Sequence, residues 1–300
     1  MLAKIGDVEV WRILESDGPL MPVARFFPTL TAEALEANRA AAGESIAHDP
    51  AAREDWVRLP VQAFLLRTPR RLILVDACVG NHKTVPHLPQ WHDRRDGRFL
   101  AGLAAAGASA GDVDLVLCTH LHVDHVGWTT SLDGDRWVPT FPNARVLASA
   151  EDLAMAEARA AQDPDGAAGH VHRQTLRPLQ EAGRLETLPL AQAGDVSLDP
   201  SIRLTPTPGH TPGHLSVVIR APQGPGAAVT GDLIHSPIQC ALPDLCPIVD
   251  ADAATASATR RAFMEESADS GRLNFATHFP LPSVGRFRRD GEAFAWDDAF

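Results

Sequence analysis

The chain has 300 residues, of which 45% are hydrophobic and 22% charged, a composition that is ordinary for a globular protein and sufficient for one sizeable domain. A formal net charge of −11 argues against nucleic acid as a main partner, because phosphate binding depends on clustered Lys and Arg, and the basic residues here are scattered. The sequence contains no uncharged apolar run of about 18 residues and no secretory signal near Met1, so we expect a cytoplasmic protein without a membrane partner.

The first elements in chain order are β-strands. Residues 7–14 alternate between apolar and polar positions, as a half-buried strand does. Residues 61–67 and 71–76 predict a hairpin that turns at Thr68-Pro69-Arg70. These strands open a β-rich first half of the chain.

An extension at residues 18–60 separates the first strand from this hairpin. Within it, residues 32–42 predict a helix that is N-capped by Thr31 and ended by Gly43. We interpret the extension as a lid or a dimer arm. Because its stretch Phe26-Phe27-Pro28 could cover a neighbour's surface, we expect a homodimer.

Helices and strands then follow one another along the chain. Residues 98–106 predict a helix that ends at Gly107, and residues 109–112 resemble a capping box before a strand at 114–118. Residues 151–167 predict a mostly exposed helix that frays at 163–166. Strands resume near Leu185, Ile202, Leu215 and Ala227. This spacing by itself supports an α/β or α+β fold with a buried sheet.

The segment His120-Leu121-His122-Val123-Asp124-His125 places four candidate metal ligands in six residues, directly after the apolar run at 115–118. On an extended strand end, residues 120, 122 and 124 point to one side, and a turn after Asp124 returns His125 toward the same space. One short loop could therefore serve two metal ions.

Four further candidate ligands each follow an apolar run that is typical of a strand, and they are Asp76, His210, Asp232 and His278. Side chains at strand ends are held rigidly, which suits a metal site. From spacing alone, His214 could replace His210 as the ligand, since both lie in the stretch Pro208-Gly209-His210-Thr211-Pro212-Gly213-His214.

These residues, in this order and over positions 76–278, resemble the five signature motifs of the metallo-β-lactamase fold superfamily. The resemblance implies an αββα sandwich of two mixed sheets between helices, here as a single domain over residues 1–300. It assigns His120, His122 and His210 to a first metal ion. It assigns Asp124, His125 and His278 to a second, with Asp232 as the bridging carboxylate. It favours His210 over His214, and it places Asp76 and His214 behind the ligands as supporting residues.

Imidazole and carboxylate ligands without thiolate suit Zn²⁺, or Mn²⁺, Co²⁺ or Fe²⁺ in place of one or both zinc ions. Two such ions about 3.5 to 4 Å apart would bind a hydroxide between them and polarise a carbonyl or phosphoryl oxygen, which favours hydrolysis. Asp124 or Asp232 would then transfer a proton as a catalytic residue.

Departures from related families narrow the reaction. Dizinc β-lactamases generally carry Cys or Ser at the position of Asp232, whereas lactonases, glyoxalase II and phosphotriesterases carry Asp. Flavodiiron proteins place Glu where His122 stands, which disfavours a redox centre. Lactonases of this fold often have a Tyr three residues after the bridging Asp, but this chain has no Tyr, and His235 occupies that offset. We hypothesise that His235 polarises the substrate carbonyl as a catalytic residue.

The remaining candidates are weaker. Apolar residues near the ligands in sequence are candidate substrate contacts, namely Phe26, Phe27, Trp128, Ile238 and Phe279. His82 could border the pocket, and the other histidines are expected to be exposed, namely His48, His87, His92, His170 and His172. The four cysteines form no C-x-x-C pair and are expected to be free thiols, with Cys118 packed in its strand. Arg286, Arg288 and Arg289 are expected on a solvated strand face.

The sequence therefore predicts a dinuclear zinc hydrolase similar to quorum-quenching lactonases and methyl parathion hydrolase, acting on a lactone or related ester as a small-molecule substrate. Phosphotriester hydrolysis on the same site is the alternative. A second alternative is a metal-binding sensor or partner module without turnover. A glyoxalase II role is a further option, but no basic cluster for a glutathione carboxylate is evident.

Overall fold

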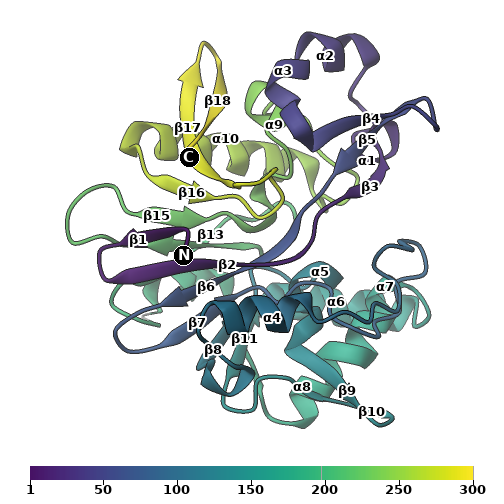
Figure 1. The fold of residues 1–300 in the computed structure, drawn as a ribbon, viewed down its shortest axis with the longest axis vertical. Coiled ribbons are helices and arrows are strands. Elements are labelled where there is room, and N and C mark those ends of the chain that lie inside the picture. Colours follow the sequence, from purple (N-terminus) through teal and green to yellow (C-terminus); the bar gives the residue numbers. More distant parts are fainter. Residues whose placement is uncertain (197, 300) are drawn as a thin grey trace.

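Two mixed β-sheets packed face to face occupy the centre of the molecule, as Figure 1 shows for a computed structural model that describes residues 1–196 and 198–299. The first sheet has seven strands among these residues, in the order β1-β2-β6-β7-β8-β11-β12. Their bounds are Ala3–Ile5, Val8–Ser16, Val61–Arg67, Leu72–Val75, Leu115–Leu117, Arg145–Ser149 and Leu185–Leu188. Strands β6 and β7 form the predicted antiparallel hairpin, and β7, β8, β11 and β12 run parallel.

The second sheet contains six strands within the described residues, in the order β13-β14-β15-β16-β17-β18. Their bounds are Ile202–Pro206, Leu215–Ile219, Ala227–Val229, Leu273–Phe275, Val284–Asp290 and Ala293–Asp298. Neighbouring strands are antiparallel except β15 and β16, which run parallel. Asp232 and His278 therefore follow strands that end at the same edge.

The two sheets are held together by alternating apolar side chains. Phe64 and Val75 of the first sheet and Val217 and Phe275 of the second belong to one buried cluster, and the rings of Phe64 and Phe275 lie 5.6 Å apart. Because successive side chains of a strand point to opposite faces, the same strands also present apolar residues to the helices outside.

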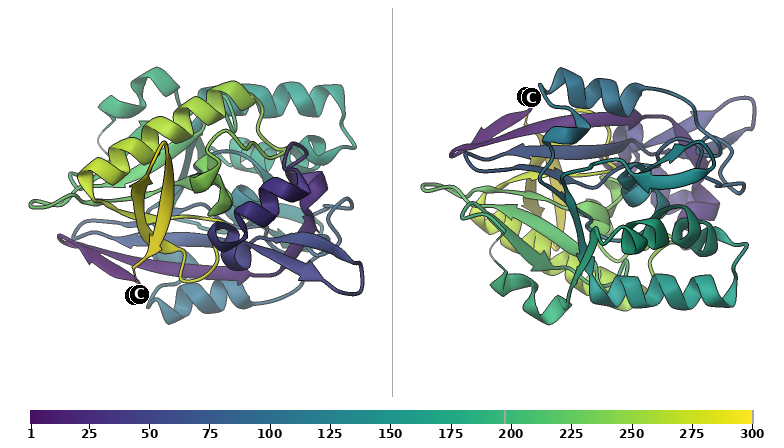
Figure 2. Two further views of the ribbon diagram at one scale, coloured as in Figure 1. Left: turned by 90° about the horizontal axis from the view of Figure 1, so that it is seen from above. Right: turned by 90° about the horizontal axis from the view of Figure 1, so that it is seen from below.

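Helices cover both outer faces. Phe99 of α4 (Arg98–Ala105) packs in one cluster with Ile13 and Leu65 of the first sheet, and Phe263 of α10 (Ala253–Ser270) packs with Phe287 of the second. Figure 2 shows α10 and α4 on opposite sides of the sheets. The predicted αββα sandwich is confirmed.

The extension at residues 18–60 contains a small sheet of its own, in the order β3-β5-β4. Its elements are β3 (Pro19–Pro22), α1 (Val23–Phe26), α2 (Ala32–Ala37), α3 (Arg39–Ala42), a 3-10 turn at Gly43–Ser45, β4 (Ile46–Asp49) and β5 (Glu54–Arg58). Thr31 caps α2 and Gly43 ends α3, as predicted. The single predicted helix is broken at Asn38, whose side chain donates to the Ala34 carbonyl oxygen at 2.8 Å and so competes with the helical ladder.

The predicted helix at 151–167 is two helices, α6 (Ala150–Gln162) and α7 (Ala167–Val171). Most of residues 151–167 are exposed, as predicted, while Asp152, Ala156 and Ala160 form a buried face. The predicted capping box opens the 3-10 turn Ala110–Asp112.

The remaining elements are α5 (Val123–Val126), β9 (Thr130–Asp133), β10 (Arg136–Pro139), a short π-helix at His172–Leu176, α8 (Arg177–Glu181) and α9 (Ile238–Ala241), with 3-10 turns at Gly127–Thr129, Leu190–Asp195 and Gly231–Leu233. Over the described part of the chain, every helix is too short or too polar to cross a membrane.

Candidate metal centre

The candidate ligands meet at one edge of the sandwich because the strands before them end there. Strands β7 and β8 are parallel, so Asp76 and the segment from His120 leave the first sheet side by side. Strands β15 and β16 deliver Asp232 and His278 from the second sheet in the same way. Loops at the carboxyl ends of parallel strands are a common place for sites, since rigid strands hold them.

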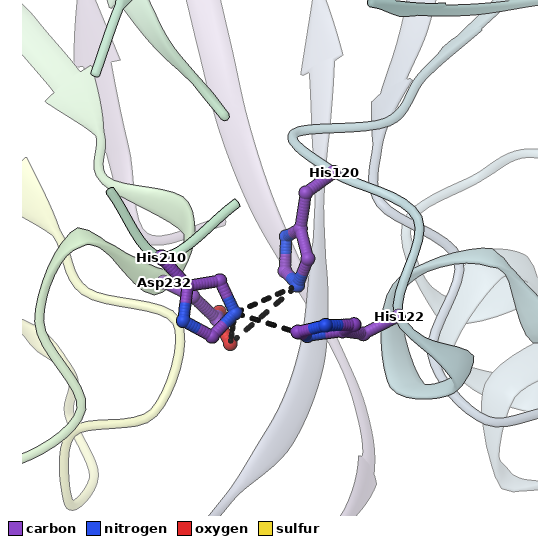
Figure 3. Close-up of side chains that lie close together, drawn as sticks. All are labelled: His120, His122, His210 and Asp232. Atoms are coloured by element: carbon purple, nitrogen blue, oxygen red, sulfur yellow. Dashed lines mark hydrogen bonds and ion pairs between the residues drawn. The ribbon is translucent and has the colours of Figure 1, made fainter. Parts of the chain in front are cut away.

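Figure 3 shows the first cluster, in which His120, His122, His210 and Asp232 point toward one another. The His210 Nε2 atom lies 3.2 Å from His120 Nε2 and 3.0 Å from His122 Nδ1. The Asp232 Oδ2 atom lies 3.4 Å from His210 Nε2. Three ring nitrogens and one carboxylate oxygen thus surround one point.

Asp124, His125 and His278 form the second cluster. The Nε2 atoms of His125 and His278 lie 3.4 Å apart, and each is 3.6 Å from Asp124 Oδ2. The Oδ1 atom of Asp232 lies 3.1 Å from His125 Nε2 and 3.0 Å from His278 Nε2. Asp232 therefore presents one oxygen to each cluster.

Proton positions explain why a cation fits between these atoms. His278 Nδ1 lies 2.7 Å from the Pro60 carbonyl oxygen, which can only accept, so Nδ1 donates and the neutral ring has a lone pair on Nε2. His125 Nδ1 faces the Asp76 carboxylate at 2.9 Å, and His210 Nδ1 faces the Asp250 carboxylate at 2.9 Å. The Nε2 lone pair of His210 then faces that of His120 in the first cluster, and the Nε2 lone pair of His125 faces that of His278 in the second. Facing lone pairs repel each other, and a divalent cation between them relieves the repulsion.

The pKa shifts of the candidate ligands also favour a bound cation. Burial, together with the neighbouring His210, lowers the pKa of His122 to about 3, so this ring is neutral and free to coordinate near pH 7. Burial disfavours charge on His278, but the Asp232 and Asp124 carboxylates outweigh it and raise its pKa. These buried carboxylates therefore require positive charge beside them, which a metal ion supplies.

Asp76 lies behind His120 and His125 and supports both candidate ligands. Besides facing His125, it accepts hydrogen bonds from the Thr119 backbone N–H at 2.8 Å and the Thr119 hydroxyl at 3.0 Å. Asp76 adopts a φ of 62°, unusual for a residue other than Gly, which turns the chain sharply as it leaves β7. The same hydroxyl lies 3.1 Å from His120 Nδ1, so Asp76 is linked to both histidines.

His214 holds the backbone at Asp232. Its Nδ1 lies 3.1 Å from the Thr207 carbonyl oxygen and its Nε2 accepts the Asp232 N–H at 2.9 Å, which occupies both ring nitrogens. The residue before Asp232, Gly231, has a φ of +58°, and a Cβ at this position would lie 2.6 Å from His214 Nε2, so only Gly lets the chain pass so close to the ring. Sequence spacing did not distinguish His210 from His214 as a ligand. The structure does, because His210 points into the cluster and His214 does not.

His235 lies beside the centre, with its Nε2 atom 3.2 Å from Asp232 Oδ2. Its ring stacks on His278 at a centroid distance of 5.6 Å, and Phe26 meets its face edge-on at 5.7 Å. The Nδ1 atom is buried without a protein partner among the described residues.

A cavity of about 260 Å³ opens onto the cluster and contacts His122, Asp124, Asp232, His235 and His278. The extension forms one wall with Leu20, Met21, Phe26 and Leu59. Helices α6 and α7 form another, with Met155, Ala156, Ala168 and Val171. Leu88, Trp91, Leu121, Val123 and Val249 complete a mostly apolar lining, with His87 and Arg159 as basic side chains.

Of the five predicted substrate contacts, only Phe26 lines this cavity. Phe27 and Ile238 are fully buried in the core, and Phe279 packs against Trp296 with ring centroids 4.8 Å apart. Trp128 stacks on Phe99 and donates to the Glu15 carboxylate at 2.6 Å. Trp128, Ile238 and Phe279 are close to the ligands in sequence, but their side chains, like that of Phe27 in the extension, point into the interior.

Several other expectations can be compared with the structure. His87 is exposed as predicted but lines the cavity, whereas His82 does not line it and lies 3.4 Å from Asp93. The four cysteines are free, and Cys118 is buried. Arg288 and Arg289 are exposed, as predicted, and pair with Asp297 and Asp269.

Sequence reasoning missed Asp250 and Glu15. Asp250 lies in a loop and faces His210 from behind. Glu15 lies near the end of β2, is fully buried and accepts from the Val79 and Gly80 backbone N–H groups, which fixes the chain after Asp76. Neither residue stands near another ligand in sequence, although an acidic residue at the end of an apolar strand was a signal for Glu15.

Comparisons with known proteins concern the family and the fold of the chain. A model of the metallo-beta-lactamase superfamily matches residues 56–269. In an alignment of 191 positions that covers 59% of this chain, the sequence is 27% identical to N-acyl homoserine lactonase AttM of Azorhizobium caulinodans, and the match spans 66% of that relative, just under two thirds.

Two solved structures are similar over nearly the whole chain. The hydrolase AbOPH of the beta lactamase superfamily has a TM-score of 0.78 and 25% identity, covering 99% of this chain and 96% of its own. AidC, a dizinc quorum-quenching lactonase in complex with a product, has a TM-score of 0.77 and 23% identity, with the same coverage. The latter likeness concerns the fold alone.

Proposed function

This chain belongs to the metallo-beta-lactamase superfamily, and we propose that it is a dinuclear zinc hydrolase that opens a lactone or a related ester. The observation that carries this proposal is the position of Asp232, whose two oxygens face two separate clusters at the floor of an apolar cavity. A carboxylate that faces two such clusters suits a pair of ions better than one. The similarity to the lactonase AttM supports an ester bond as the target.

Each cluster offers donors that zinc accepts. His120, His122 and His210 would hold one ion, Asp124, His125 and His278 the other, and Asp232 both. When bound, such a pair supplies an ionised water near neutral pH and a Lewis acid for the carbonyl oxygen. The Oδ1 atom of Asp232 is buried without a hydrogen-bond donor among the described residues, as a metal ligand should be.

The chain's own residues complete the reaction. The apolar walls from the extension and from α6 and α7 hold a hydrophobic part of the substrate and exclude water around its carbonyl group. Asp124, which lines the cavity, takes a proton from the attacking water and passes it to the leaving oxygen. His235 donates an N–H to the oxygen on which negative charge develops, because it lies at the cavity beside Asp232.

Metal content and a substrate panel test the proposal together. We expect elemental analysis of purified protein to give two divalent ions per chain. We expect the zinc-loaded protein to hydrolyse lactones with long acyl chains faster than matched phosphotriesters. A faster phosphotriester reaction would favour the alternative hydrolase, and two ions without turnover of lactone, ester, thioester or phosphotriester would favour a sensor or partner module. Fewer than two ions would contradict the dinuclear centre.

The homodimer stays a prediction. Phe26 and Phe27, from which it was inferred, are both buried in this chain and are not a free apolar surface. Light scattering of the purified protein gives the number of chains directly.

A further inference from the structure

His210 is supported from behind by a fully buried ion pair that the proposed reaction does not use. Its Nδ1 atom lies 2.9 Å from Asp250 Oδ1, and Asp250 Oδ2 accepts from Arg260 Nη2 at 3.1 Å. Both charged side chains are 0% exposed. A buried pair of this kind is costly to desolvate, so stability alone does not explain its presence.

The Arg260 guanidinium does more than balance the charge of Asp250. Its Nε atom donates to the Leu233 carbonyl oxygen at 2.9 Å, directly after Asp232. Its Nη1 atom donates to the carbonyl oxygens of Pro243 at 2.7 Å and Leu245 at 3.0 Å. One side chain of α10 therefore fixes both the partner of His210 and the loop that carries Asp232, and the planar fork of Arg suits these several acceptors better than Lys.

Backbone contacts also join the His210 loop to the start of α10. The Ala251 N–H donates to the His210 carbonyl oxygen at 3.0 Å. Gly209 lies so close to α10 that a Cβ at this position would be 2.3 Å from the Ala256 Cα atom. The loop before His210 is thus seated against the start of α10, and the backbone that carries the imidazole cannot shift away from Asp250 without moving this contact.

The second cluster has a different support. His125 faces Asp76, which pairs with no Arg or Lys among the described residues and takes its other hydrogen bonds from Thr119. His278 donates to the Pro60 carbonyl oxygen. The histidines of the second cluster are therefore oriented by Asp76 and Pro60, and this cluster shares only Asp232 with the loop that Arg260 holds.

We propose that Asp250 and Arg260 are a positioning pair for the first cluster, and that they set how tightly His120, His122, His210 and Asp232 hold a cation, with a much smaller effect on the second cluster, which they reach only through the loop of Asp232. This inference rests on the proposed dinuclear centre. Outer hydrogen-bond partners of metal-binding histidines are generally worth about 10- to 100-fold in metal affinity.

Single-cluster variants make the test specific. In His278→Ala the first cluster keeps all of its ligands, and in His122→Ala the second cluster does. Asp250→Asn is added to each, and zinc binding is measured by competition with a chelator of known affinity. We expect roughly 10- to 100-fold weaker zinc binding in the His278→Ala protein and less than about threefold change in the His122→Ala protein.

Equal weakening in both backgrounds, or no change in the first, would overturn the inference. Because Asp250→Asn leaves Arg260 buried without its counter-charge, the double change Asp250→Asn/Arg260→Met is measured beside it, and circular dichroism of the zinc-free proteins checks folding. A wild-type protein that binds no zinc would instead refute the proposed function, so the two failures are distinguishable.

Discussion

The Asp232 carboxylate is the residue on which the proposed centre depends most, since each of its oxygens faces a different set of imidazoles. Replacing it with Asn keeps the shape of the side chain but leaves an amide N–H₂ that repels a cation on one side. We expect Asp232→Asn to bind at most one ion per chain by elemental analysis. Activity should fall by roughly 1000-fold or more. Two tightly bound ions in this variant would contradict a bridging role.

His235 allows a second prediction at the same scale. If its N–H stabilises the developing oxyanion, His235→Ala lowers kcat by roughly 100-fold at unchanged metal content, and His235→Gln recovers part of the loss through its amide N–H. Steady-state kinetics on metal-quantified protein gives the answer. Unchanged turnover of His235→Ala would contradict this role. If His235→Ala instead loses metal but keeps a normal kcat per occupied centre, His235 serves to hold Asp232 in place.

At the scale of elements, helix α6 matters to the centre through one carboxylate. Asp152 accepts from the Thr211 hydroxyl at 2.8 Å and the Gly213 N–H at 2.7 Å, so it ties α6 to the turn after His210. Burial, partly offset by the hydrogen bond from Thr211, raises the pKa of Asp152 from 3.8 to about 6. The ionised form is therefore disfavoured in the folded protein relative to the unfolded chain.

The sign of this shift gives a pH prediction. A carboxyl with a raised folded pKa contributes stability that is full below its unfolded pKa and is lost as pH rises through about 6. Relative to Asp152→Asn, the wild type should thus lose roughly 2 to 3 kcal/mol between about pH 4 and pH 7. Thermal melts of both proteins across this range measure it. Parallel Tm curves would refute the shift.

The wall formed by α6 and α7 yields a prediction about substrate size. Ala168 lines the cavity, whereas the exposed Ala161 of α6 does not. We expect Ala168→Phe to raise KM for long-chain lactones about tenfold and to leave short-chain lactones nearly unchanged, because the ring fills space that a chain would occupy. Ala161→Phe is the matched control. An equal effect on both chain lengths would place the substrate elsewhere.

At the scale of the whole molecule, the proposed ions would join the two sheets. His120, His122 and His125 follow β8 of the first sheet, and Asp232 and His278 follow β15 and β16 of the second. A ligand that binds only the folded state stabilises it by mass action. We expect removal of metal by EDTA to lower the Tm by on the order of 10 °C. Asp232→Asn should show a smaller shift, and no shift in the wild type would argue against structural coupling through metal.

The sequence by itself determined the fold family and the candidate ligand set, because those signals are local. Strand ends before Asp76, His120, Asp232 and His278 are visible as apolar runs followed by a polar residue, and the segment 120–125 concentrates its ligands within a few residues. The two predicted hairpin strands and the caps at Thr31 and Gly43 were correct for the same reason.

Only the tertiary structure decided which side chains surround the centre. Asp250 and Arg260 reach His210 from α10 and the loop before it, and the cavity walls come from the extension and from α6 and α7, all distant from the ligand segment in sequence. Trp128 and Phe279 are neighbours of ligands in the chain but point into the core. Adjacent residues on a strand or turn face different directions, whereas contact across packed layers depends on how the whole chain folds.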